Sequence, residues 1–174
     1  LGMAAHLEGR ASGVLDRTGL AQKGGAVVSH VRIATRPEAL HGTRIPAHAA
    51  DLLLACDPLV AASEACLESL HAARTSSLLD THLAATAAFV MDNSVRWDTG
   101  ALLARVRHRS RECHAVEASR MAASLLGEAI GGNVLLLGYA FQRGLLPLAS
   151  DSILRAIELN GVAIEMNRLA FGLG

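Results

Sequence analysis

Hydrophobic and polar side chains alternate along residues 26–35, and this is the clearest pattern in the chain. One face of an extended segment would carry Val27, Ser29, Val31 and Ile33. The other face would carry Val28, His30, Arg32 and Ala34. Alternation that is rich in β-branched residues is typical of a strand. The pattern therefore predicts a strand over residues 26–35, with His30 and Arg32 on the same face.

Two continuous apolar runs predict further strands that are buried. The first run covers residues 51–56 and the second covers residues 76–81. Short apolar runs without alternation are typical of parallel strands that are covered on both faces. Weaker patterns predict short strands at residues 14–16 and 114–117. Residues 84–91 stay open between helix and strand, because the alanines favour a helix and Phe89 and Val90 favour a strand.

Helices are predicted at both ends of the chain and between the strands. Pro58 begins a helix that runs to about residue 71, because proline is tolerated in a first turn. Asp98 is expected to cap a helix over residues 99–110. Gly144 and the pair Asn160-Gly161 mark helix ends. The other predicted helices cover residues 1–8, 118–126, 133–143, 151–159 and 162–171. The predicted loops cover residues 18–25, 37–47 and 92–98.

Strands that alternate with helices over the first two-thirds of the chain predict an α/β fold. We expect a three-layer α/β/α arrangement, with a Rossmann-like, open, mostly parallel sheet and a helical C-terminal part. The length of 174 residues suits one domain, residues 1–174, and there is no internal repeat or long linker.

Charge and cysteine content narrow the possible classes of protein. Sixteen basic and sixteen acidic residues balance, which argues against a nucleic-acid binder and against attraction to an anionic membrane. No apolar run approaches the roughly 18 residues of a membrane span, and the first residues do not resemble a signal peptide. Cys56, Cys66 and Cys113 form no CxxC motif, so no metal or iron–sulfur ligand set is predicted. We expect buried thiols in a reducing cytoplasm.

A glycine pair followed by a strand forms the first candidate site. Its residues are Lys23, Gly24, Gly25, Ser29, His30 and Arg32. Lys23 is the only lysine of the chain. Adjacent glycines let the backbone approach a ligand and let N–H groups cradle an anion, and nearby cations favour a phosphate or carboxylate. A plain Gly-Gly turn with solvated charges explains the same residues, and the spacing of a Walker A loop is absent.

The second candidate site lies where the buried strands end. Thr81 and His82 follow Asp80 at the carboxyl end of the 76–81 strand, where ligands bind in open α/β sheets. An Asp–His pair can act as acid or base, and capping of the next segment explains these residues equally well. Cys56 ends the neighbouring run, but without a neighbouring base it is not assigned as a nucleophile.

Residues 105–111 hold four arginines that suit phosphate binding. Leu102, Leu103 and Val106 would form a buried stripe at helical spacing, which favours a solvated arginine face as the interpretation. The asparagines Asn133, Asn160 and Asn167 are interpreted as caps or turn residues, with contact to a partner domain as the alternative for Asn133.

Residues 19–34 (GLAQKGGAVVSHVRIA) resemble the loop–strand signature of the γ-type domain of indolepyruvate ferredoxin oxidoreductases, in the 2-oxoacid:ferredoxin oxidoreductase family. Residues 50–63, 80–89, 138–148 and 156–168 resemble further stretches of that domain in the same order. Together they cover most of the chain. Family members carry a strand and a Gly-rich turn before the position of Leu1, so the chain is expected to lack that segment.

The resemblance implies an enzyme that oxidatively decarboxylates an aryl 2-oxoacid to its acyl-CoA and passes the electrons to ferredoxin. Thiamine diphosphate, Mg and [4Fe-4S] clusters are expected in partner domains or subunits, and coenzyme A is a candidate ligand. This domain would shape the active-site cleft, with no catalytic residue of its own, and would be inactive alone. On that reading the interdomain face carries Lys23, Gly24, Gly25, His30 and Arg32. We also expect an oligomer.

Two alternatives from other classes remain at this point. One is a non-catalytic α/β module for nucleotide binding or assembly. The other is a free-standing hydrolase that uses His82 or Cys56, although the strained strand–helix turn of such enzymes is not evident.

Overall fold

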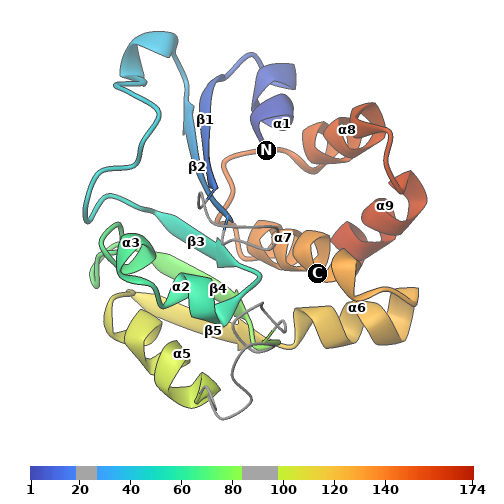
Figure 1. Cartoon of the computed structure of the whole chain (residues 1–174). Coiled ribbons are helices and arrows are strands. Elements are labelled where there is room, and N and C mark those ends of the chain that lie inside the picture. Colours follow the sequence, from blue (N-terminus) through green and yellow to red (C-terminus); the bar gives the residue numbers. More distant parts are fainter. Residues whose placement is uncertain (19–26, 84–97) are drawn as a thin grey trace. The chain divides into compact units, whose positions relative to one another are not determined.

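The computed structural model describes residues 1–18, 27–83 and 98–174, and the chain forms two compact units (Figure 1). Unit 1 consists of residues 1–16, 29–45 and 119–174, and unit 2 consists of residues 17–28 and 46–118. The open segment 84–91, nearly all of the predicted loop 18–25 and most of the predicted loop 92–98 lie outside the described residues.

The first part of the chain forms α1 (Gly2–Leu7), β1 (Ala11–Thr18) and β2 (Val27–Ala34). The predicted helix 1–8 and strand 26–35 are confirmed, and the strand predicted at 14–16 is longer in both directions. Sequence patterns missed its first residues because Ala11 and Gly13 are of types that favour strands poorly. β1 and β2 pair in a two-stranded sheet of their own. The short 3-10 helix η1 (Pro37–Ala39) follows, inside the predicted loop 37–47.

The helical end of the chain contains α6 (Ala118–Leu126), η2 (Ala129–Gly131), α7 (Gly132–Gln142), α8 (Ser150–Asn160) and α9 (Ile164–Leu173). The predicted helices are confirmed within two residues at each end. Gly144 and Gly161 adopt the left-handed φ values of +69° and +73° that suit glycine after a helix.

The core of unit 1 joins the two ends of the chain. Its buried cluster consists of Ala4, Ala5, Leu148, Ile153 and Phe171. α1 packs against α8, and a carboxylate oxygen of Glu8 accepts a hydrogen bond of 2.7 Å from the backbone N–H of Ala149. Ala149 precedes α8, so Glu8 places a negative charge at the positive end of that helix. This hydrogen bond is the largest cause of the lowered pKa of Glu8.

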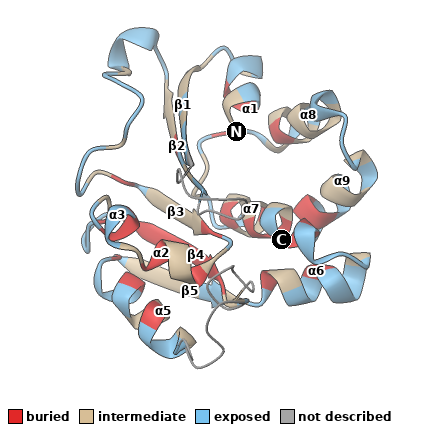
Figure 2. Cartoon of the chain, viewed as in Figure 1, coloured by how far each residue is buried: buried red, intermediate tan, exposed pale blue. Residues whose placement is uncertain are grey.

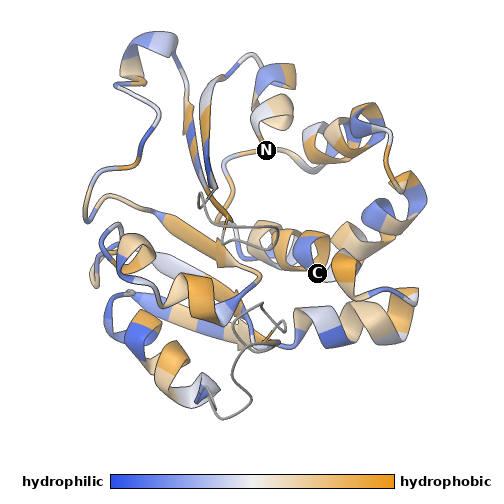
Figure 3. Ribbon diagram, viewed as in Figure 1, coloured by the Kyte–Doolittle hydropathy of each residue, from blue (hydrophilic) through white to orange (hydrophobic). Residues whose placement is uncertain are grey.

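Unit 2 is built on a parallel sheet in the order β3 (Leu52–Ala55), β4 (Ser76–Asp80) and β5 (Glu112–Val116). Leu78 of the central strand pairs with Leu54 on one side and with His114 on the other. Figure 3 shows the apolar character of β3, and Figure 2 shows that β4 is buried along its length. The predicted α/β fold with a parallel sheet is confirmed.

The helices of unit 2 are α2 (Pro58–Ala61), α3 (Glu64–Leu67) and α5 (Thr99–His108). α2 packs against β3, β4 and α5. Asp98 caps α5 as predicted, because its side chain accepts a hydrogen bond from the N–H of Gly100 at 2.8 Å. The single helix predicted from Pro58 to about residue 71 is wrong. Ser63 is extended, with φ −69° and ψ 149°, and its hydroxyl donates to the carbonyl of Val60, which separates α2 from α3.

Within the three described ranges, no helix combines the length and the apolar character that crossing a bilayer requires.

Candidate functional site

Two polar side chains of β2 form hydrogen bonds with the backbone of residues 41–45 in unit 1. Arg32 Nη1 donates hydrogen bonds to the backbone carbonyls of His41, at 2.6 Å, and Gly42, at 2.9 Å. The backbone N–H of Ile45 donates to His30 Nδ1 at 3.2 Å. Both side chains therefore point to residues 41–45, and the predicted shared face of His30 and Arg32 is confirmed.

His30 is 7% exposed, although it sits in a strand whose other residues are less buried. Because Nδ1 accepts the hydrogen bond from Ile45, the neutral ring carries its proton on Nε2. Protonation of Nδ1 would remove this acceptor. The His30 imidazole thus accepts a backbone hydrogen bond from the 41–45 segment at Nδ1.

Ser29 lies on the opposite face of β2, as the alternation predicts. Its hydroxyl donates to Asp16 Oδ1 across the β1–β2 pair at 2.6 Å. Lys23, Gly24 and Gly25 lie outside the described residues. Of the first candidate site, the structure therefore brings His30 and Arg32 together on one face and places Ser29 on the other.

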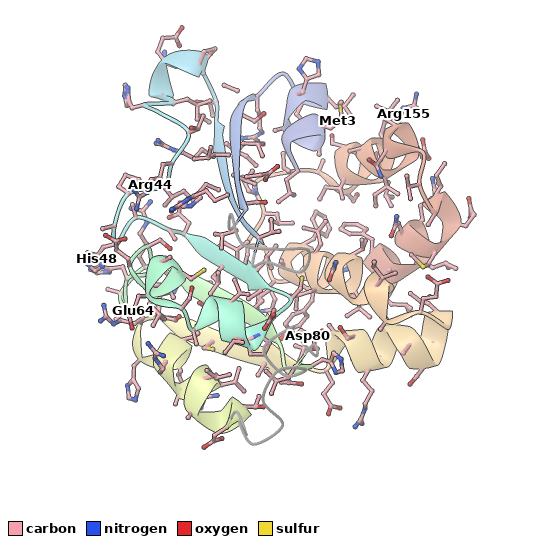
Figure 4. All side chains as sticks on the ribbon, viewed as in Figure 1. Met3, Arg44, His48, Glu64, Asp80 and Arg155 are labelled. Atoms are coloured by element: carbon pink, nitrogen blue, oxygen red, sulfur yellow. The ribbon has the colours of Figure 1, made fainter. Side chains whose placement is uncertain are left out.

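The second candidate site lies at the carboxyl ends of β3 and β4 in unit 2, where Figure 4 labels Asp80. Asp80 is 1% exposed and accepts a hydrogen bond from the backbone N–H of His82 at 3.0 Å. The N–H of Thr81 donates to the carbonyl of Val116 at 2.9 Å, which continues the pairing of β4 with β5. The bond from His82 places the Asp80 carboxylate in a local turn after β4. The next segment, whose capping was the alternative to acid–base chemistry, lies outside the described residues.

Cys56 and Asp57 follow β3 at the same edge of the sheet. Asp57 caps α2 by accepting a hydrogen bond from the N–H of Leu59 at 2.8 Å. Desolvation, together with the smaller effects of the Asp80 and Asp57 carboxylates, raises the pKa of the Cys56 thiol to about 11. Cys56 is exposed as a whole residue, which weakens the effect of desolvation on its pKa. The two carboxylates also raise this pKa, so its direction does not depend on desolvation alone. A thiol with this pKa stays protonated at neutral pH, which speaks against a Cys56 nucleophile.

The described residues contain no group of three His, Cys, Asp or Glu side chains that could hold a metal ion. Cys56 follows β3, Cys66 is in α3 and Cys113 is in β5. The donor set in this part of the chain does not fit an iron–sulfur cluster.

The arginines near the end of α5 behave as a solvated face. Leu102 and Val106 are buried, and Leu103 is half-buried. Arg105 Nη2 lies 2.5 Å from Glu64 Oε1, and Arg111 donates to both Ser76 and Glu112. Arg107 interacts with the Cys113 side chain, so three of the four arginines have partners within the chain while Arg105, Arg107 and Arg109 stay exposed.

The family model of pyruvate ferredoxin/flavodoxin oxidoreductases matches residues 1–174. The chain belongs to this family. The comparison with curated proteins gave no match.

Two solved structures share the fold of this pyruvate ferredoxin/flavodoxin oxidoreductase family member. One is pyruvate oxidoreductase subunit PORC from Thermotoga maritima, with 19% identity, a TM-score of 0.60, and coverage of 98% of this chain and 81% of that chain. The other is the gamma subunit of a keto/oxoacid ferredoxin oxidoreductase from Geobacter sulfurreducens, with 16% identity and a TM-score of 0.61. That alignment covers 99% of this chain and 83% of the other.

Sequence reasoning missed the partners that hold the predicted residues in place. The acceptors of Arg32 are backbone carbonyls, which leave no trace in side-chain patterns. Asp16, the partner of Ser29, is visible in the sequence only as a polar residue of a short predicted strand. A sequence prediction of a longer strand paired with the 26–35 strand would have indicated the contact between Ser29 and Asp16.

Proposed function

We propose that this chain is the γ-type domain or subunit of a thiamine-diphosphate-dependent 2-oxoacid:ferredoxin oxidoreductase. The complex oxidatively decarboxylates an aryl 2-oxoacid such as indolepyruvate to acyl-CoA and reduces ferredoxin. The family match over the whole chain carries the general reaction. The resemblance of residues 19–34 to the indolepyruvate branch supports the aryl substrate.

The chain shapes the cleft in which other domains do the chemistry, and it supplies no catalytic residue. The residues that face substrate or coenzyme A are Lys23, Gly24, Gly25, Ser29, His30, Arg32, Thr81 and His82. A 2-oxoacid and coenzyme A are both anionic, and Lys23 and Arg32 supply positive charge for them. The raised pKa of Cys56 supports the view that this thiol is not a nucleophile in the proposed reaction.

Thiamine diphosphate, Mg and the [4Fe-4S] clusters belong to partner domains or subunits. The dispersed cysteines support this assignment, since they offer no cluster ligand set in the described residues. Ferredoxin is reached through the complex, which is an oligomer in the cytoplasm.

The proposal is tested by purifying the chain with its neighbouring domains or subunits and by measuring ferredoxin reduction that depends on a 2-oxoacid and on coenzyme A. The substrates compared are indolepyruvate, phenylpyruvate, pyruvate and 2-oxoglutarate. We expect the highest kcat/KM with an aryl substrate, and neither turnover nor bound iron in the chain purified alone. A preference for pyruvate would reject the aryl assignment and keep the general one. Turnover by the chain alone would reject the division of labour.

A Lys23→Ala variant of the same complex examines the role of the glycine pair. We expect a higher KM for coenzyme A or for the 2-oxoacid, with an unchanged melting temperature. Unchanged KM values for both would remove Lys23 from the ligand-facing set.

A further inference from the structure

Within the described residues, the guanidinium of Arg32 forms hydrogen bonds through Nη1 alone. Both hydrogens of Nη1 are used, one toward the carbonyl of His41 and one toward the carbonyl of Gly42. Among the described residues, no hydrogen bond uses Nε or Nη2. These two nitrogens form the edge that presents two parallel N–H groups, and this edge matches the two oxygens of a carboxylate or phosphate.

The hydrogen-bond acceptors of Arg32 differ in kind from those of several other arginines. Within the described part of the chain, six other arginines form ion pairs with carboxylates: Arg10, Arg74, Arg105, Arg111, Arg155 and Arg168. Arg32 forms no such pair there, and its recorded acceptors are carbonyls. Carbonyls orient a guanidinium but do not neutralise its charge, so the free edge keeps its attraction for an anion.

The surroundings of Arg32 hold this edge in one orientation. Arg32 is half-buried. The segment that supplies its two carbonyls forms a third hydrogen bond with β2, from the N–H of Ile45 to His30 Nδ1. A side chain that is already ordered loses less entropy when it binds a ligand.

We propose that the Nε–Nη2 edge of Arg32 is a preformed binding site for an oxyanion of a small-molecule ligand. The inference rests on the proposed function, because the reaction proposed there offers two ligands with such a group. One is coenzyme A, through its phosphates, and the other is the 2-oxoacid, through its carboxylate. The chemistry recognised is the same in both, and Arg32 is a binding residue rather than a catalytic one.

Titration calorimetry on the assembled complex, with coenzyme A and with phenylpyruvate as separate probes, tests this site. Loss of a two-pronged bond to a charged group is expected to weaken one probe about 10- to 100-fold in Arg32→Gln. The probe that weakens identifies the source of the oxyanion. Arg155→Gln is the matched control, because it removes an exposed arginine of the same unit and should leave both dissociation constants unchanged.

A second pair of variants separates binding from loop anchoring. Arg32→Lys keeps the charge but engages the same carbonyls with a single ammonium, so it should also weaken the sensitive probe severalfold. It replaces Arg32→Gln if that variant does not fold. Ile45→Pro removes the N–H that His30 Nδ1 accepts but leaves the Arg32 guanidinium and its two carbonyl acceptors, so it should retain most of the affinity.

Unchanged dissociation constants for both probes in Arg32→Gln or in Arg32→Lys would overturn the proposal. Equal losses in Ile45→Pro and Arg32→Gln would also overturn it, because they would assign Arg32 an anchoring role only. These outcomes are read from binding, so they are distinguishable from a failure of the proposed function, which is read from turnover.

Discussion

The carbonyl oxygen of Phe171 in α9 lies so close to Gly138 in α7 that a Cβ added to Gly138 would stand 2.1 Å from it. This distance is far below any van der Waals contact, and the obstacle is backbone rather than a movable side chain. The close approach of α7 and α9 therefore depends on the absence of a side chain at Gly138. The same two helices hold Phe141 and Phe171, whose rings pack with centroids 5.5 Å apart.

Gly138→Ala is expected to lower the free energy of unfolding by about 1–3 kcal/mol, because the helices must separate to admit the methyl group. Gly172→Ala is the matched control, since a Cβ at Gly172 meets nothing within 4 Å. Alanine favours a helix over glycine, so Gly172→Ala should be neutral or stabilise by up to about 1 kcal/mol. Urea denaturation of the two variants gives both values, and equal destabilisation would contradict the tight contact.

The Thr75 side chain joins two segments in the core of unit 2. Its hydroxyl donates to the carbonyl of Ala50 at 2.7 Å and accepts from the N–H of His71 at 2.8 Å, and the residue is 0% exposed. Thr75→Val keeps the shape but leaves both groups unpaired, so we expect a loss of about 1–3 kcal/mol. Thr75→Ser keeps the hydroxyl and removes one methyl group, which should cost about 1 kcal/mol. Thermal denaturation compares them, and a smaller loss in Thr75→Val than in Thr75→Ser would refute the role of the hydroxyl.

Glu112 links β5 to β4 through its carboxylate. Its pKa is lowered to about 2, most of all by the hydrogen bond of 2.7 Å from Ser76, and also by the hydrogen bonds from Arg111 and His114. A lowered pKa in the folded state means that ionised Glu112 stabilises the fold above its ordinary pKa of 4.5. This contribution is lost as the pH falls from 4.5 toward about 2.

Glu112→Gln should therefore lower the melting temperature at pH 7 and make it fall less steeply between pH 4.5 and pH 2. Glu165→Gln, at an exposed position of α9, serves as the control and should leave the acid limb unchanged. Parallel acid limbs for Glu112→Gln and the parent chain would show that this carboxylate is not responsible.

Cys56 should react slowly with alkylating reagents. A rise of its pKa from 9.0 to about 11 lowers the thiolate fraction at neutral pH about 100-fold, and the thiolate is the reactive species. Iodoacetamide labelling at pH 8, followed by mass spectrometry, should be about 100-fold slower for the folded chain than for the chain in denaturant. Labelling at equal rates would contradict the raised pKa and would reopen the hydrolase alternative.

Much of the secondary structure follows from local patterns alone. Alternation predicts β2, a continuous apolar run predicts β4, and Asp98, Gly144 and Gly161 mark helix ends that the structure contains. These features depend on residues within a few positions of one another, where strand periodicity, capping and left-handed φ act directly. The family resemblance of residues 19–34 is equally local.

Only the tertiary structure decided which segments meet. It placed β1 and β2 in a sheet of their own, divided the helix after Pro58, and paired Ser29 with Asp16. It also supplied the carbonyls of His41 and Gly42 as the acceptors for Arg32. Backbone acceptors are the same in every residue and so have no signature in a sequence, and the pKa of a thiol depends on carboxylates that folding brings near it. The sequence alone therefore determines which residue types the candidate site contains. The packing around these residues determines their hydrogen-bond partners and the pKa of the Cys56 thiol.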